Sequence, residues 1–282
     1  MKLGITSGYL TKYGLEAGAK RLKAHGYDCT DYQNFINTET EFFKLPEKEF
    51  ERQIRKEREI IESAGVIIHQ AHGPWRYPPK DDTEENRAER FASMSKAIRG
   101  CAYLGTDKFV IHPIMPFGGN SSEQPEVMKA INFEFMSRLC EVAKEYGIIV
   151  CYENMPFPML PITTSKHVAD FARQINSDNF KVCLDTGHCL VCGESPADAV
   201  RYIGKDLLGA LHIHDNDGKA DKHRIPGEGI ADWGAFTDAL YDIGYDGVFS
   251  LETSIPSGHP EEEQERLERE LAILGKRLAR IE

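Results

Sequence analysis

Long hydrophobic runs are missing from this chain of 282 residues. No stretch approaches the roughly 18 consecutive apolar residues that a membrane-spanning helix requires. The first residues, MKLGITSGYL, also lack the basic segment followed by a long apolar segment that is typical of a secretory signal. We therefore expect a cytoplasmic protein with no membrane partner.

A disulfide framework is also missing. The seven cysteines are an odd number, and most lie inside strand-like or helix-like patterns, as buried reduced thiols do. Cys189 and Cys192 form a lone CxxC motif. Without a second pair this motif is a weak indication of a zinc or redox site, and packing just after a strand is the favoured interpretation.

Positive charge is scarce, with 34 lysines and arginines against 45 acidic residues and a net charge of −11. Affinity for nucleic acid depends on cations that neutralise phosphates, so a nucleic acid is a disfavoured partner. Net charge says little about a metal site, because a bound divalent cation can reverse the local sign of an acidic pocket.

No Gly/Ser-rich linker or low-complexity tract divides the chain, and we expect one domain over residues 1–282. Strand-like and helix-like patterns alternate eight times at about 35 residues per unit, close to the ~250 residues typical of eight βα units. The expected strands are 3–6, 27–32, 66–72, 108–113, 148–154, 181–187, 210–215 and 247–253. The alternation predicts a (β/α)8 TIM barrel.

Two helical segments are especially clear. Apolar residues recur every three or four positions after Asp232, a suitable N-cap, and again through the last twenty residues. The acidic run Glu261 to Glu263 and the basic residues Lys276, Arg277 and Arg280 suit the two ends of a helix dipole, so we interpret them as a solvated helix surface.

Six of the expected strands carry ionisable residues at or just beyond their carboxyl ends. These residues are His72, His112, Glu153, Asp185 with His188, His212 with His214 and Asp215, and Glu252, and Asp221 and His223 lie beyond the seventh strand. Side chains at the carboxyl ends of barrel strands meet at one rim. An open doubly wound sheet would bring few strands to its ligand site, whereas here strands three to eight all contribute, which favours a closed barrel.

A single histidine or glutamate in such a position is usually a satisfied core residue or an ion-pair partner. The whole set is different, because burying so many polar groups without a cation would cost several kcal/mol per unpaired charge. Nitrogen and oxygen donors without thiolate suit Mn²⁺, Co²⁺ or Zn²⁺, and there are enough of them for more than one ion.

These residues resemble the xylose isomerase-like barrels, a superfamily of sugar isomerases, ketose 3-epimerases and endonuclease IV-type abasic-site nucleases. The similarity covers nearly the whole chain and includes DTGH, HIHD, LET and the PGEG at 226–229. It implies a metal site of Glu153, Asp185, His212 and Glu252. Strand alternation alone leaves His212 and His214 equivalent, and the resemblance favours His212.

The resemblance implies two competing functions. In a sugar or sugar-phosphate isomerase or epimerase, Glu153 and Glu252 would act as acid and base through an enediolate, His188 would take part in catalysis and contact the substrate, and Trp75 and Arg76 would bind the sugar. In a trinuclear zinc phosphodiesterase, Glu153 would bridge two ions, and the further ligands would be His72, His112, His188, Asp221 and His223.

The expected rim loops favour the isomerase. The loop after strand two is acidic, and the loop HGPWRYPPKD offers only Arg76 and Lys80 as cations, which is poor equipment for bending DNA. Ketose 3-epimerases carry a glutamate where this chain has Met159, and a substrate arginine near His223, so the hypothesis is a sugar isomerase or epimerase of another specificity. A metal- or sugar-binding barrel without turnover is the third alternative, and two carboxylates on one metal argue against it. A homo-oligomer is compatible with the sequence.

Overall fold

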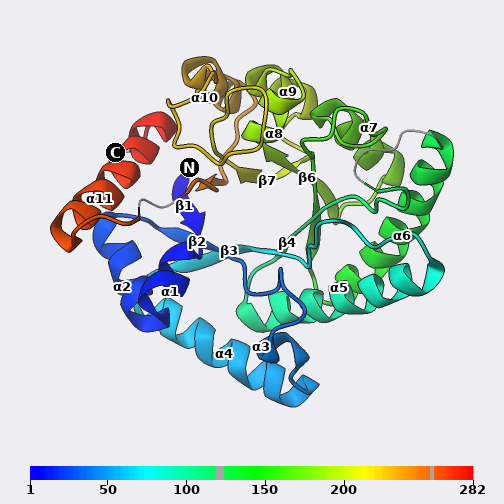
Figure 1. Cartoon of the computed structure of the whole chain (residues 1–282), viewed down its shortest axis with the longest axis horizontal. Helices are drawn as coiled ribbons and strands as arrows, with labels where there is room; N and C mark the ends of the chain where they lie inside the picture. The colour runs from blue at the N-terminus through cyan, green and yellow to red at the C-terminus, as the bar shows by residue number, and fades with distance from the viewer. Residues whose placement is uncertain (119–123, 255–256, 282) are drawn as a thin grey trace.

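Eight parallel strands alternate with helices along the chain and pair in the order β8-β1-β2-β3-β4-β5-β6-β7 (Figure 1). The computed structural model describes residues 1–118, 124–254 and 257–281. A parallel bridge between Ile213 and Leu251 joins the two end strands, so the sheet closes on itself. The strands are β1 Lys2–Thr6, β2 Cys29–Tyr32, β3 Ile67–His72, β4 Lys108–Ile111, β5 Ile149–Glu153, β6 Phe180–Asp185, β7 Leu208–His212 and β8 Val248–Leu251.

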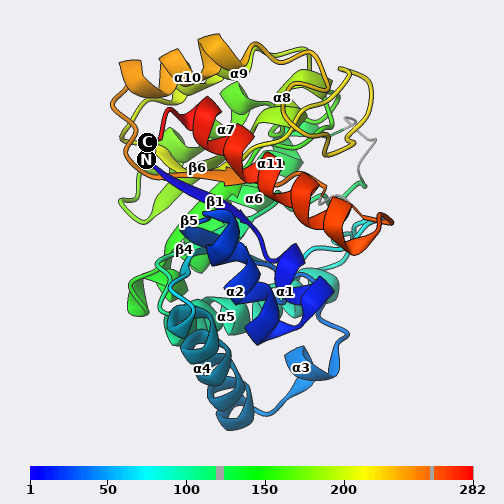
Figure 2. The same cartoon turned by 90° about the vertical axis from the view of Figure 1, so that its left-hand side faces the viewer.

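Helices surround the barrel on its outside, and Figure 2 shows α11 crossing that surface beside α2. The helices are α1 Gly8–Tyr13, α2 Leu15–His25, α3 Glu41–Lys44, α4 Glu47–Ser63, α5 Glu84–Leu104, α6 Pro125–Glu145, α7 Ser165–Ile175, α8 Thr186–Val191, α9 Pro196–Ile203, α10 Trp233–Asp242 and α11 Glu261–Ala279. The predicted (β/α)8 barrel is confirmed, and the doubly wound alternative is wrong because strand order never reverses.

Local sequence signals explain where the clearest helices begin. The Asp232 carboxylate accepts a hydrogen bond from the amide of Ala235 and caps α10, as its position predicts. Helix α11 has its three glutamates in the first turn and Lys276 and Arg277 in the last, which complements the helix dipole.

The lower barrel interior is filled by small side chains. Val110, Cys151, Cys183 and Ala210 are fully or almost fully buried and form one apolar cluster, contributed by β4 to β7. All seven cysteines are free, in agreement with the expectation of reduced thiols. The side chains nearer the carboxyl ends of these strands lie on top of this apolar layer.

Two irregularities adjust the strand register. Between β2 and β3, Thr30 pairs with Ile68 but Asp31 pairs with Gln70, so His69 is an extra residue. Between β6 and β7, Val182 pairs with Leu208 but Cys183 pairs with Ala210, so Gly209 is extra. Such bulges redirect the side chains beyond them. The second one places His212 beside Asp185.

Within residues 1–118, 124–254 and 257–281, no helix has the length and apolar character needed to cross a bilayer.

Candidate metal centre and active site

The candidate metal centre lies directly above the apolar layer of the barrel. Inward-facing side chains of a strand are two residues apart. Two residues beyond each member of the apolar layer, and on the same face of its strand, comes a side chain suited to binding a metal. These side chains are His112, Glu153, Asp185 and His212. Glu252 comes directly after the last residue of β8. The pleat of five neighbouring strands thus collects donors at one end of the barrel.

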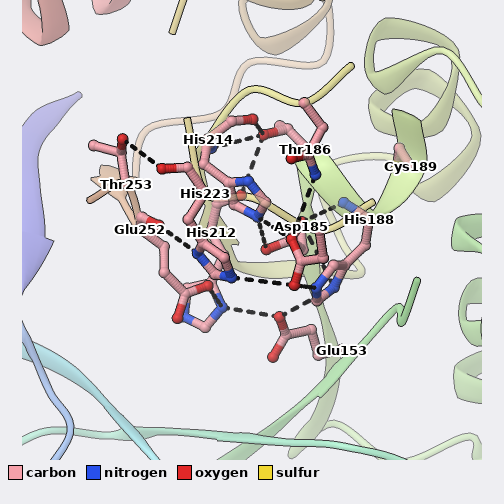
Figure 3. Close-up of polar contacts among 12 residues, drawn as sticks. Glu153, Asp185, Thr186, His188, Cys189, His212, His214, His223, Glu252 and Thr253 are labelled. Atoms are coloured by element: carbon pink, nitrogen blue, oxygen red, sulfur yellow. Dashed lines mark hydrogen bonds and ion pairs between the residues drawn. The ribbon is translucent and has the colours of Figure 1, made fainter. Parts of the chain in front are cut away.

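Glu153, Asp185, His212 and Glu252 form the central donor group, in which one ligand atom of each lies within 4.8 Å of the others. Figure 3 shows His212 between Glu252 and the pair of Glu153 and Asp185. His212 Nδ1 lies 3.0 Å from Glu153 Oε1 and 3.0 Å from Glu252 Oε2. The four residues expected to share one ion are therefore brought together.

The electrostatics of the central group favour charged forms. Burial by itself disfavours the anion of Glu153, but the nearby rings of His212 and His112 lower the pKa of this carboxyl well below its ordinary value. Burial likewise opposes protonation of His212, but negative neighbours, including Glu252 and Glu153, raise its pKa well above the usual range. The buried Glu153 carboxylate therefore depends on positive charge beside it.

Two further histidines lie on the Glu153 side. His112 Nε2 lies 3.0 Å from Glu153 Oε2, and His72 Nε2 lies 3.7 Å from the same oxygen. Burial lowers the pKa of His112 to about 4, so a neutral imidazole with an available nitrogen is the ordinary form. His72, Glu153 and His212 make up a second group of suitable ligand spacing.

A third group consists of His188, His214, Asp221 and His223. Asp221 Oδ2 lies 3.2 Å from Nε2 of both His188 and His223. Burial opposes protonation of His188 and His223. Even so, Asp185 and Asp221 raise the pKa of His188 to about 9, and Asp221 and Glu252 raise the pKa of His223 to about 10. His214 stacks on His223 with ring centroids 4.1 Å apart.

The residues present fit a divalent cation. The donors are imidazole nitrogens and carboxylate oxygens, a set that suits Zn²⁺, Mn²⁺ or Co²⁺. The buried Nδ1 atoms of His112 and His214 have no hydrogen-bond partner among the described residues, and unpaired buried polar atoms are costly. The three overlapping donor groups can accommodate one ion at the centre and further ions on either side.

A pocket of about 520 Å³ opens onto these donors. Its walls include Trp75, Tyr77 and Phe157, and the rings of Tyr77 and Phe157 stack with centroids 6.1 Å apart. Its lining also includes Glu153 and Glu252. The described residues that line it include neither lysine nor arginine. The pocket has room for a small molecule and offers it aromatic faces and carboxylates.

Two residues singled out in the sequence lie away from this pocket. Arg76 donates to the carbonyl of Lys80 and pairs with Glu89 at 3.7 Å, so its guanidinium faces the loop and α5 instead of the donors. Met159 is 68% exposed and is absent from the described pocket lining. Trp75, in contrast, packs edge-on against His112 with ring centroids 4.4 Å apart.

Sequence reasoning missed two residues of β2 and its end. Asp31 is fully buried, and its Oδ2 lies 2.9 Å from His212 Nε2. Gln33 Nε2 donates to Glu252 Oε1 at 3.2 Å. The available signal was the acidic residue inside the apolar pattern YDCTDY, followed two positions later by another polar residue, which is the spacing of one strand face.

Known proteins provide an independent comparison. An uncharacterized protein of Methanocaldococcus jannaschii is 26% identical over 255 residues, which cover 89% of this chain and 83% of the relative. A D-psicose 3-epimerase of Enterocloster bolteae is 24% identical over 273 residues, covering 92% and 84%. An inosose isomerase of Bacillus licheniformis is 27% identical over 179 residues, covering 61% and 63%.

Solved structures show the same fold. A crystal structure of D-psicose 3-epimerase in the presence of D-fructose superposes with a TM-score of 0.78 at 21% identity over 99% of both chains. The protein IolI with a bound zinc atom gives a TM-score of 0.75 at 20% identity over 100% of this chain and 97% of the other. A sequence model of the xylose isomerase-like TIM barrel matches residues 19–276. The chain therefore belongs to the xylose isomerase-like TIM barrel family.

Proposed function

We propose that this protein is a metal-dependent isomerase or epimerase of an unphosphorylated sugar or a closely related polyol ketone. The observation that carries the proposal is the placement of Glu153 and Glu252, which approach the same nitrogen of His212 at 3.0 Å and line one pocket. The sugar epimerases and inosose isomerases among the relatives support the same class of reaction.

The central group would hold a divalent cation through Glu153, Asp185, His212 and Glu252. When bound, such a cation supplies Lewis-acid polarisation of a carbonyl and the adjacent hydroxyl, which makes the neighbouring C–H more acidic. Glu252, whose side chain is 13% exposed, can reach a substrate in the pocket and accept that proton. In an isomerase Glu252 would also return the proton to the neighbouring carbon. Glu153 is almost fully buried, and the nearby histidine rings favour its anion, so in an epimerase it would have to gain a proton before returning one to the substrate.

The walls of the pocket support a neutral sugar. Trp75, Tyr77 and Phe157 can cover the apolar face of a sugar ring, while the carboxylates and histidines accept and donate hydrogen bonds to its hydroxyls. A phosphate group would need cations or clustered amides for recognition. Since the described lining has neither lysine nor arginine, we favour a substrate without phosphate.

The test is proton exchange. Incubated with Mn²⁺ or Co²⁺ in D₂O, the protein should introduce deuterium beside the carbonyl of at least one compound in a panel of ketoses, aldoses, keto-sugars and inososes. Glu252→Gln should slow exchange by about 10²- to 10⁴-fold, the usual contribution of a general base. Metal content must be measured in the same samples, because Glu252 is also a proposed ligand.

Glu228→Gln is the matched control, because Glu228 is an exposed carboxylate on a loop of the same rim, and its exchange rate should equal that of the parent. Absence of exchange across the whole panel, together with efficient incision of duplex DNA at an abasic site, would reverse the assignment.

A trinuclear zinc phosphodiesterase is the second candidate, favoured by one observation. His72 and His112 gather on Glu153 Oε2, and His188 and His223 gather on Asp221 Oδ2, so donors for two further ions lie around the central group. Elemental analysis of protein purified without chelator separates the two functions. One ion per chain supports the isomerase, and three zinc ions together with loss of one in Asp221→Ala, His223→Ala would support the phosphodiesterase.

A further inference from the structure

Asp31 lies beneath the central group on the far side of His212. Asp31 Oδ2 is 2.9 Å from His212 Nε2, while Nδ1 of the same ring faces Glu153 and Glu252. Both residues are fully buried. The two nitrogens of this imidazole therefore have separate partners, a carboxylate below the ring and the donor group above it.

The register shift between β2 and β3 builds this arrangement. With His69 as the extra residue, Asp31 pairs with Gln70. The Gln70 amide then donates to Asp31 Oδ2 at 3.0 Å. Asp31 Oδ2 accepts from both Gln70 and His212. Gln70 on β3 therefore orients the carboxylate, and the carboxylate orients the His212 ring on β7.

The burial of Asp31 lowers the stability of the fold. Its Oδ1 has no hydrogen-bond partner among the described residues, and an incompletely satisfied buried carboxylate destabilises a core. A side chain kept at that cost is suited to a functional role. Carboxylates behind metal-binding histidines fix the ring and its tautomer and make the free nitrogen a better ligand.

We propose that Asp31 is a positioning residue that holds the Nε2 proton of His212 and so directs Nδ1 to the metal. The inference rests on the proposed function for the presence of an ion at the central group. It assigns to β2, which provides none of the four central donors, control over how strongly that group binds a cation.

The test is metal affinity, measured without turnover. Chelator-treated parent protein and Asp31→Asn, both as full chains, are titrated with Mn²⁺ and separately with Zn²⁺. Asparagine keeps the size of the side chain and removes its charge, and we expect the dissociation constant to rise by about 10- to 100-fold, the usual effect of losing such a partner. Thr30→Val is the matched control, because Thr30 is also buried on β2 but its hydroxyl donates to the carbonyl of Ile5. Its affinity should equal that of the parent.

A second measurement uses only the parent protein and therefore decides the matter even when Asp31→Asn fails to fold. With ¹⁵N-labelled histidine and bound Zn²⁺, His212 should carry its proton on Nε2. A proton on Nδ1, or a dissociation constant for Asp31→Asn within twofold of the parent, overturns the proposal. Sugar exchange with unchanged affinity refutes only the role of Asp31, whereas weakened affinity without any exchange refutes only the proposed reaction.

Discussion

Glu268 provides the sharpest test of what holds the outer layer of the barrel together. It lies on α11, its side chain is fully buried, and Oε1 accepts from Tyr13 Oη at 2.6 Å and from Lys12 Nζ at 3.0 Å. Oε2 accepts from Arg21 Nε at 2.7 Å. One carboxylate therefore links the last helix to α1 and α2.

The expected loss of unfolding free energy follows from these contacts. Glu268→Gln preserves the shape and one acceptor oxygen, but turns an amide toward one set of donors and removes the charge opposite Arg21 and Lys12. Hydrogen bonds to charged groups contribute about 1.5–3 kcal/mol each, and removing one partner of a buried ion pair costs about 3–5 kcal/mol. We expect the free energy of unfolding at pH 7 to fall by about 3 kcal/mol.

The effect should depend on pH in a defined direction. Burial opposes ionisation of Glu268, but hydrogen bonds from Tyr13, Arg21 and Lys12 lower its pKa below the ordinary 4.5. A carboxylate with a lowered folded-state pKa stabilises the fold above its unfolded pKa, and the contribution disappears as the pH falls through the folded value. The difference between parent and variant should therefore be full at pH 7 and shrink below about pH 4.5.

Urea unfolding of both proteins at pH 7 and at successively lower pH measures this difference. Glu265→Gln is the control, because Glu265 pairs with Arg269 on the exposed side of α11, where a single ion pair contributes at most about 1 kcal/mol. A loss below 1 kcal/mol for Glu268→Gln at pH 7, or a loss that is the same at every pH, would refute the reasoning.

Two further predictions concern the DTGH segment and the thiols. Gly187→Ala should destabilise the fold by about 1–3 kcal/mol or more, because an added Cβ would lie 1.9 Å from His214 Cε1. The control is Gly234→Ala, whose added Cβ would meet only Asp232 Oδ1 at 3.4 Å, and it should melt at the parent temperature or slightly above it. Equal melting temperatures of the two variants would contradict the packing described. Burial raises the pKa of all seven cysteine thiols, that of Cys192 to about 12, so a thiol reagent at pH 8 should modify the folded protein far more slowly than the urea-unfolded chain; rapid modification of two thiols in the folded protein would instead indicate a redox role for Cys189 and Cys192.

The fold could be predicted because its determinants are local. Each strand is a short apolar run, and the residue after that run reaches the same rim whatever the exact geometry of the barrel. Glu153 and Glu252 needed only this rule to be placed together. Helix α10 needed only its apolar spacing and the Asp232 cap.

The missed features depend on relations between strands that one strand does not encode. Whether Asp31 meets His212 depends on the extra residues His69 and Gly209, and a bulge has no clear signature in an apolar run. Arg76 turns toward the Lys80 carbonyl at 2.8 Å and Glu89 at 3.7 Å, and both contacts depend on the path of the loop between β3 and α5. Strand alternation correctly placed both His212 and His214 inward but could not assign their different partners.

The closure of the barrel has a consequence for how the molecule opens. Among the described residues, β7 and β8 meet through one isolated bridge, with Ile213 N bonded to Ser250 O and Glu252 N bonded to Ile213 O. His212 and Glu252 stand on the two sides of this seam. Partial unfolding begins where backbone pairing is sparse, so separation of these two strands would dismantle the central group before the rest of the sheet is lost. A cation bound by both His212 and Glu252 would hold the ends of β7 and β8 together. The rate of hydrogen exchange at the Ile213 and Glu252 amides would measure how much the cation slows the separation of these strands.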